Sequence, residues 1–427
     1  MIEFYWLHLT LQLYIQIFNP MPLIDYSFLS KILPKAKIKK SFKKAKSSYL
    51  ARVRFATALF FFGMGFCFAT WASRIPDLKL TLKLSESDLG TILFALPIGQ
   101  LLAMPLSGKV VAKYGSRKIA ILGLITYAFF LTLLGLPTQS WQLGLALFLF
   151  GFFGNFCNIA VNTLGVYTQQ LFEKPIMGAF HGSWSLAGFS GALLALIMLY
   201  FNLNPFQHFA IVFGIIIVLI AFNFRYLVKT SVKQLEKKEK VSFFNIQDKS
   251  LIWLGVISFC CMASEGIMFD WSGVYFKEIV KAPGSLVVLG YTSFMVTMAI
   301  GRFLSDILVA KFGPRKVLIT SGFVISTGLY MAVLFPNLIA CTLAFMLVGF
   351  GVSNVIPIVF NAAGNSKIVP TSIALTIVSS ISFMGFLIGP PIIGYIAEMT
   401  SLQYSFAFIG VFGVLISLLT MRLKLFR

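Results

Sequence analysis

Two related stretches decide the fold of this chain: SGKVVAKYGSRKIAI at residues 107–121 and SDILVAKFGPRKVLI at residues 305–319. Eight positions are identical at a constant offset of 198 residues: Ser107, Val111, Ala112, Lys113, Gly115, Arg117, Lys118 and Ile121. A second pair, LALFLFGF at 145–152 and LAFMLVGF at 343–350, repeats the offset. The chain therefore contains an internal duplication, with one copy in each half.

Composition places this duplication in a membrane. Of the 427 residues, 58% are apolar and 11% are charged, whereas a soluble domain carries about 25% charged residues. Each crossing takes about 20 apolar residues, and the apolar runs predict an all-α membrane protein with twelve spans. The predicted spans are 55–73, 88–107, 118–136, 142–162, 177–200, 207–227, 251–271, 286–305, 316–335, 338–359, 371–394 and 404–422.

The basic residues predict the orientation of these spans. With both termini in the cytoplasm, 30 of the 35 Lys and Arg residues fall on the cytoplasmic side, as the positive-inside rule requires. The opposite loops hold only Arg74, Lys79, Lys83, Lys277 and Lys281. This distribution explains the net charge of +21 without a nucleic-acid partner. Eight lysines at 31–46 are expected to lie beside anionic lipid headgroups, although a plain topology signal is the simpler interpretation.

Four segments follow from the duplication. They are an N-terminal extension with a basic run at 1–50, a six-helix half at 51–227, a cytoplasmic linker at 228–249 and a second half at 250–427 with a short basic tail. Residues 1–20 lack the features of a signal peptide, and Met21 is an alternative start. Because each copy has six spans, both halves stand the same way up, as in transporters whose halves rock around a central site.

The repeated loop GKVVAKYGSRK (108–118) and the two-times-six plan resemble the major facilitator superfamily. FATWASRIPDLK (68–79), AFHGSWSLAGFSGAL (179–193), ASEGIMFDWSGVY (263–275) and GFLIGPPIIGYIAE (385–398) resemble a bacterial inner-membrane branch akin to fucose–proton symporters. The resemblance implies alternating access, with the two loops locking the outward-facing state. It assigns gating to Gly108, Lys113, Gly115, Arg117, Gly313 and Arg315. Ala112 departs from the family pattern, which usually has Asp at this position of the first loop.

Two carboxylates in the seventh span, Glu265 and Asp270, are candidates for proton coupling, because ionisable groups inside a bilayer are costly. No Lys or Arg is expected at the depth of Glu265, and an acid without a cation in low dielectric can gain and release a proton. The alternatives are a neutral structural acid at Glu265 and exposure to periplasmic water at Asp270. Arg302 and Asp306 have i,i+4 spacing and predict a cytoplasmic gate, or else a surface salt bridge.

Polar amides in the spans are candidates for binding the solute. They are Gln100, Asn155, Asn158, Asn162, Asn354 and Asn361. Amides both donate and accept hydrogen bonds and suit a neutral polar solute, and Trp184 offers a flat face for a sugar ring. Hydrogen bonding between helices is the simpler role for each amide alone.

The sequence has no phosphate-binding loop, no nucleophile with a base and an acid, and no metal-ligand spacing, so it predicts neither an enzyme nor a cofactor. It predicts a monomeric, multi-pass transporter of the bacterial inner membrane that moves a small polar solute, such as a sugar, together with protons. Proton-driven efflux of drugs or metabolites is the alternative within transport. A non-transporting receptor or scaffold is the alternative from another class.

Overall fold

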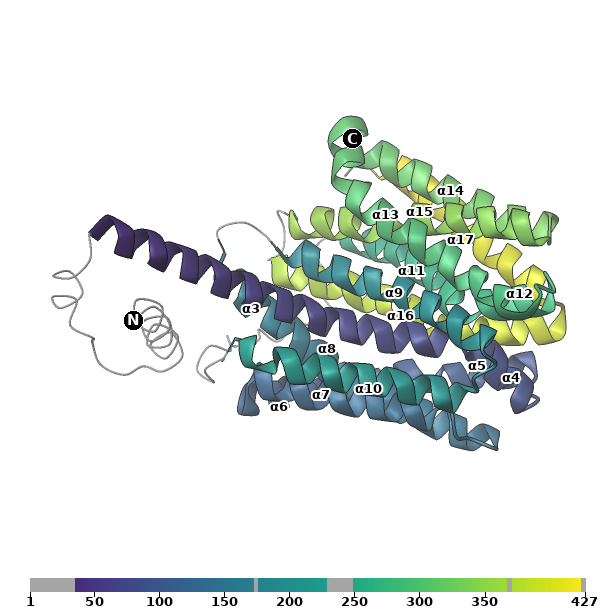
Figure 1. Ribbon diagram of the computed structural model, residues 1–427. Helices are drawn as coiled ribbons and strands as arrows, with labels where there is room; N and C mark the ends of the chain where they lie inside the picture. The colour runs from purple at the N-terminus through teal and green to yellow at the C-terminus, as the bar shows by residue number, and fades with distance from the viewer. Residues whose placement is uncertain (1–34, 173–175, 229–248, 367–370, 424–427) are drawn as a thin grey trace. The chain divides into compact units, whose positions relative to one another are not determined.

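The computed structural model describes residues 35–172, 176–228, 249–366 and 371–423 (Figure 1). The chain divides into two compact units, residues 1–52 and 53–427. In the described part of the first unit, the backbone is helical from Lys35. All the features described below belong to the second unit.

All the regular secondary structure of the described residues is helical, and they contain no strand. The first half contains α3 (Lys35–Ala72), α4 (Ile75–Thr81), α5 (Glu86–Leu93), α6 (Ala95–Tyr114), α7 (Ser116–Leu133), α8 (Ser140–Gln169), α9 (Met177–Tyr200), α10 (Pro205–Asn223) and η1 (Phe224–Tyr226). The second half contains α11 (Ser250–Asp270), α12 (Ser272–Glu278), η3 (Gly284–Val288), α13 (Leu289–Phe312), α14 (Pro314–Leu334), α15 (Leu338–Gly364), α16 (Thr371–Met399) and α17 (Leu402–Arg422).

Twelve helical segments of the described chain are long and apolar enough to cross a membrane, which confirms the predicted fold class. The second predicted span begins earlier than expected and is divided into α5 and α6 at Phe94. Its start has a capping box, in which Ser85 and Asp88 each accept a hydrogen bond from the backbone of the other. The short helices α4 and α12 follow the first and seventh spans.

Equivalent backbone turns confirm the duplication in three dimensions. Gly115 and Gly313, which precede α7 and α14, have φ values of 87° and 80°, a region that glycine enters without steric cost. Arg117 donates to the carbonyl of Phe224 at 2.9 Å, and Arg315 donates to that of Met421 at 2.8 Å. In each half, an arginine thus satisfies a free carbonyl near the end of the sixth span.

Lipid explains the apolar side chains left exposed on the helices. On α10, for example, Ile211, Ile215, Val218 and Phe222 are exposed, and their spacing of three or four residues forms one stripe. In a bilayer such a stripe contacts acyl chains, so burial against protein is unnecessary.

The two halves meet along a seam of four helices. Here α9 of the first half packs against α13 of the second, and α5 packs against α16. Helix α11 packs closely along α16, and α9 also packs against η3 of the second half. Side chains of α9, α11 and α13 therefore come together from both halves.

Candidate functional site

A buried lysine joins the two halves where α3 and α11 end, on the side with few basic residues. Lys79 on α4 donates to Glu86 Oε1 at 2.6 Å within its own half, and it also donates to Glu278 on α12 of the other half. Only 8% of the Lys79 side chain is exposed. An ion pair shielded in this way is much less screened than a surface pair.

The start of α5 forms a second connection between the halves. Glu398 Oε2, near the end of α16, accepts hydrogen bonds from the backbone N–H groups of Glu86 and Ser87 at 3.0 and 3.3 Å. A carboxylate is favoured there because the first N–H groups of a helix lack internal partners and carry partial positive charge. One turn further on, the hydroxyls of Thr91 and Tyr395 lie 3.1 Å apart.

Two glycines allow α5 and α16 to approach closely beside these bonds. A Cβ added at Gly394 would lie 2.5 Å from the carbonyl oxygen of Glu86 and 2.9 Å from the Cα of Gly90. A side chain at this position would therefore separate the helices. We call the set Lys79, Glu278, Glu398 and this glycine contact the outer latch.

Glu265 forms an ion pair, whereas the sequence predicted no Lys or Arg at its depth in the membrane. Arg302 on α13 donates to Glu265 Oε1 at 3.3 Å, and the Glu265 side chain is 6% exposed. The prediction was wrong because it counted depth along separate straight helices and ignored the reach of an arginine side chain. Arg302 also donates to Ser185 Oγ on α9 at 3.1 Å. It therefore contacts an acid of its own half and a hydroxyl of the other half.

The predicted partnership of Arg302 with Asp306 stays a prediction, because the Asp306 side chain lies outside the described residues. Arg302 itself lies at the seam, where it pairs with Glu265.

Asp270 is buried, with 7% of the residue exposed, so the alternative of exposure to periplasmic water was wrong. Among the described residues, it has no hydrogen-bond or ion-pair partner. Tyr291 of α13, whose ring lies 6.0 Å from that of Phe269, the residue before Asp270, also has a buried hydroxyl without a partner in the described chain. Tyr291 was not among the predicted site residues, since a lone tyrosine in an apolar run resembles any core aromatic.

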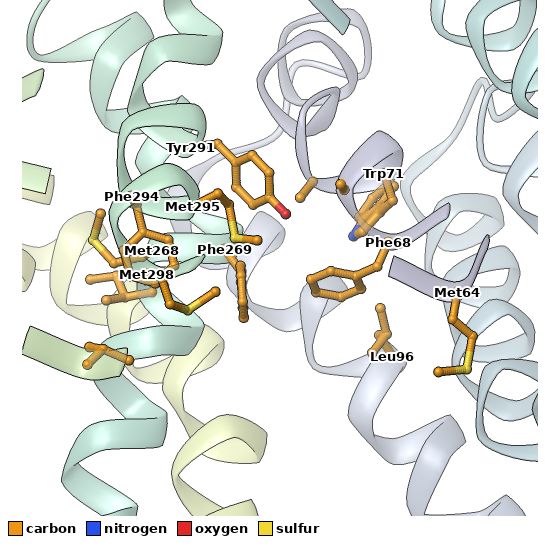
Figure 2. Close-up of a cluster of buried hydrophobic side chains, with 14 of the residues drawn as sticks. Met64, Phe68, Trp71, Leu96, Met268, Phe269, Tyr291, Phe294, Met295 and Met298 are labelled. Carbon is orange, nitrogen blue, oxygen red and sulfur yellow. The ribbon is translucent and has the colours of Figure 1, made fainter. Parts of the chain in front are cut away.

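Aromatic rings from both halves meet at the seam (Figure 2). Phe269 on α11 meets Phe68 on α3 edge to face, with ring centroids 5.3 Å apart. Trp184 on α9 lies 6.3 Å from each of these two rings, and Tyr291 lies 6.0 Å from Phe269. The structure therefore brings the predicted ring-stacking residue Trp184 to the seam.

The predicted amides are distributed differently. Asn155 is buried and accepts a hydrogen bond from Ser107 of a neighbouring helix at 2.6 Å, which favours a structural role. Local bonds link Asn162 to Asn158, and Asn365 to Asn361, along single helices. Asn354 donates to Phe350 O, but its buried Oδ1 has no partner in the described chain. Gln100 is half-buried on α6. Solute binding by these amides stays a prediction.

The predicted gating loops make contacts within their own halves. Lys113 and Lys311 each lie 5.3 Å from the ring of the next residue, Tyr114 and Phe312. The bonds of Arg117 and Arg315 likewise stay within one half. Gly108 has open space around its Cα. Gating by these residues remains a prediction, whereas the hydrogen bonds described above that cross the seam lie at the outer latch and at Arg302.

Comparison with known proteins identifies the family. The model of the Major Facilitator Superfamily matches residues 55–370 and 254–426. The chain belongs to the major facilitator superfamily. It is a multi-pass membrane transporter and not an enzyme, as the sequence predicted.

Two relatives have been named without a substrate. An uncharacterised MFS-type transporter of Yersinia pestis is 33% identical over 82% of this chain and 90% of its own length. The membrane protein MosC of Rhizobium meliloti is 28% identical over 85% of this chain and 88% of its own length.

A solved structure shares the fold of this MFS chain. The nucleoside transporter NupG superposes with a TM-score of 0.73, covering 88% of this chain and all of its own, at 14% identity. At this identity the likeness concerns the fold alone.

Proposed function

We propose that this MFS transporter moves a small polar solute by proton-coupled alternating access. The observation that carries the proposal is the double bonding of Arg302, to Glu265 in its own half and to Ser185 in the other half. This arrangement connects the charge of one acid to a contact between the halves.

The coupling follows from the charge of Glu265. While Glu265 is ionised, it holds the guanidinium of Arg302 in a charge-assisted pair. A proton on Glu265 removes that charge and leaves Arg302, whose side chain is 30% exposed, without its anionic partner. The Arg302 side chain then rearranges to pair with other groups, and this alters its hydrogen bond to Ser185 across the seam. Protonation thereby favours one arrangement of the halves over the other.

The direction of transport depends on which arrangement binds the solute better. A ligand with equal affinity for both arrangements shifts nothing, so solute and proton must each prefer one of them. The outer latch joins the two halves on the side that we assign to the periplasm, because the basic loops lie on the opposite side. Uptake of a polar ring such as a sugar is our first proposal, and export by the same cycle is the second.

The solute is expected to contact the aromatic rings of Phe68, Trp184 and Phe269. These rings come from both halves, so one ring-shaped molecule bound among them would contact both halves. A flat apolar face on such rings is a common mode of sugar and base recognition. Nucleosides belong in the test series because the name of NupG specifies them for that protein.

Reconstitution of the purified monomer tests the proposal. Sugars and nucleosides that raise its melting temperature are selected first, since a ligand of the folded state raises apparent stability. Proteoliposomes that contain a pH-sensitive dye then report whether the solute moves with protons. In Glu265→Gln, solute exchange should continue while solute-driven proton movement is lost.

Glu265→Asp serves as the matched control, because it keeps an ionisable group and should retain part of the proton movement. Unchanged proton movement in Glu265→Gln would remove Glu265 from coupling. If no solute moved in the wild type and Glu265 were dispensable, the receptor or scaffold role would be favoured instead.

A further inference from the structure

Two buried hydrogen-bond donors of the seam have no partner within the described chain: Tyr291 Oη on α13 and Trp71 Nε1 on α3. Each residue is only 1% exposed. Figure 2 shows the Tyr291 hydroxyl directed away from its helix towards the half that carries Trp71 and Phe68. Buried polar groups are almost always paired, so two unpaired donors at one seam indicate that a ligand completes them.

A carboxyl group lies near Tyr291, because Asp270 follows Phe269 in α11 and the ring of Phe269 lies 6.0 Å from that of Tyr291. Glu265 is compensated by Arg302, whereas Asp270 has no cation among the described residues. The carboxyl group without a cationic partner in this part of α11 is therefore that of Asp270.

Aromatic rings from both halves also lie near Tyr291. Phe269, which precedes Asp270 in the chain, contacts Phe68 of the other half and Tyr291 of its own. The faces of aromatic rings attract cations, and a desolvated cation gains most from them. A carboxylate next to such rings is a typical environment for a positively charged amine.

We propose that Asp270, Tyr291 and Trp71 form a subsite for a ring-shaped solute that carries one amine together with hydroxyl groups, of which amino sugars are the simplest class. Asp270 pairs with the ammonium group, while Tyr291 Oη and Trp71 Nε1 donate to oxygens of the ring. Trp71 can only donate, which fixes an acceptor on the solute. This inference rests on the proposed transport function and names its substrate class.

Proton coupling and amine binding use different acids in this scheme. Glu265 keeps the coupling role, and Asp270 changes from the predicted second coupling acid to a binding group. Because an ammonium group and a proton are alternative partners of one carboxylate, the bound solute keeps Asp270 ionised.

Thermal stabilisation of the purified full chain tests the subsite. The probes are glucosamine and galactosamine, their N-acetyl forms, the parent sugars and glucuronate, each titrated to obtain an apparent affinity. The wild type should bind an amine probe at least about 10-fold more tightly than its neutral counterparts, as a charge-assisted hydrogen bond provides. Asp270→Asn should remove this preference.

Tyr291→Phe separates binding from folding. It deletes a hydroxyl that has no protein partner, so the protein without solute should be at least as stable as the wild type, while affinity for the amine probe falls about 3- to 10-fold. Trp71→Phe should act in the same direction. Glu265→Gln is the control and should keep the amine preference.

Three outcomes would overturn the inference: equal stabilisation by amine and parent sugars, an amine preference that survives in Asp270→Asn, or no stabilisation by either amine probe. Failure of the transport proposal looks different. In that case amine binding would persist, but the bound probe would cause no solute exchange or proton movement in proteoliposomes.

Discussion

Replacing Glu278 by Gln should open the outer latch without disturbing either half. Glu278 contacts Lys79 across the seam, whereas Glu86 contacts the same lysine from within its own half at 2.6 Å. The bond to Glu86 can persist when the halves separate, but the bond to Glu278 cannot. Glu278→Gln therefore destabilises only the arrangement in which the halves are closed on this side.

The size of this destabilisation depends on how deeply the Lys79–Glu278 ion pair is buried. A surface ion pair contributes about 0–1 kcal/mol, and breaking a fully buried pair costs about 3–5 kcal/mol. The side chains of Lys79 and Glu278 are 8% and 29% exposed, and Lys79 keeps Glu86 as a partner. We therefore expect about 1–2 kcal/mol, which changes the ratio of open to closed molecules by roughly 5- to 30-fold.

Electron spin resonance between two labels measures this ratio. Lys83→Cys and Lys281→Cys place the labels on exposed positions of opposite halves, and the described native cysteines are buried. Glu278→Gln should increase the share of long distances, and it should have little further effect in a Lys79→Met background, because both changes remove the same contact.

Asp77→Asn is the matched control. Asp77 is also 29% exposed and accepts from Arg74 at 2.7 Å, but this pair lies within one half. Its loss should lower stability without changing the distance distribution. If Glu278→Gln left the distribution unchanged, or altered it no more than Asp77→Asn, the reasoning on the latch would be refuted.

Three further predictions concern packing. Gly394→Ala should keep α5 and α16 apart, because its Cβ would lie 2.9 Å from the Cα of Gly90; the same spin labels should report more open molecules. Asn155→Ala should lower thermal stability by about 0.6–1 kcal/mol through loss of one interhelical bond, while solute affinity in the thermal titrations stays constant if the amide is structural. Arg315→Gln should cost about 1–2 kcal/mol by freeing the carbonyl of Met421, measured as a lower melting temperature.

Hydropathy and the duplicated loops predicted the fold, because each span must satisfy its own backbone in lipid. Twelve spans were predicted correctly from local patterns. The division of the second span at Phe94 and the short helices α4 and α12 were missed. These features depend on how the outer ends pack together, which hydropathy along one helix does not report.

The site was predictable only in part. Glu265, Asp270 and Trp184 were identified because charge and large aromatics are rare at such positions in a membrane. The pairing of Arg302 with Glu265 was missed, since it depends on the relative placement of α11 and α13 and on the length of the arginine side chain. Ser185 and Tyr291 carry no sequence pattern that separates them from ordinary helix residues.

Comparison of the two copies separates groups that maintain the fold from groups proposed to act on solute and protons. One contact within each half is duplicated: Arg117 matches Arg315 in its bond to the sixth span. The charged groups are not duplicated, because positions 65 and 70, which correspond to Glu265 and Asp270 at the offset of 200 set by Trp71 and Trp271, hold Gly and Thr. A shared scaffold needs each contact twice, whereas one central site needs each acid once. The asymmetry of the charges thus favours a single coupled site built mainly from the second half, with the first half contributing Ser185 and aromatic surface.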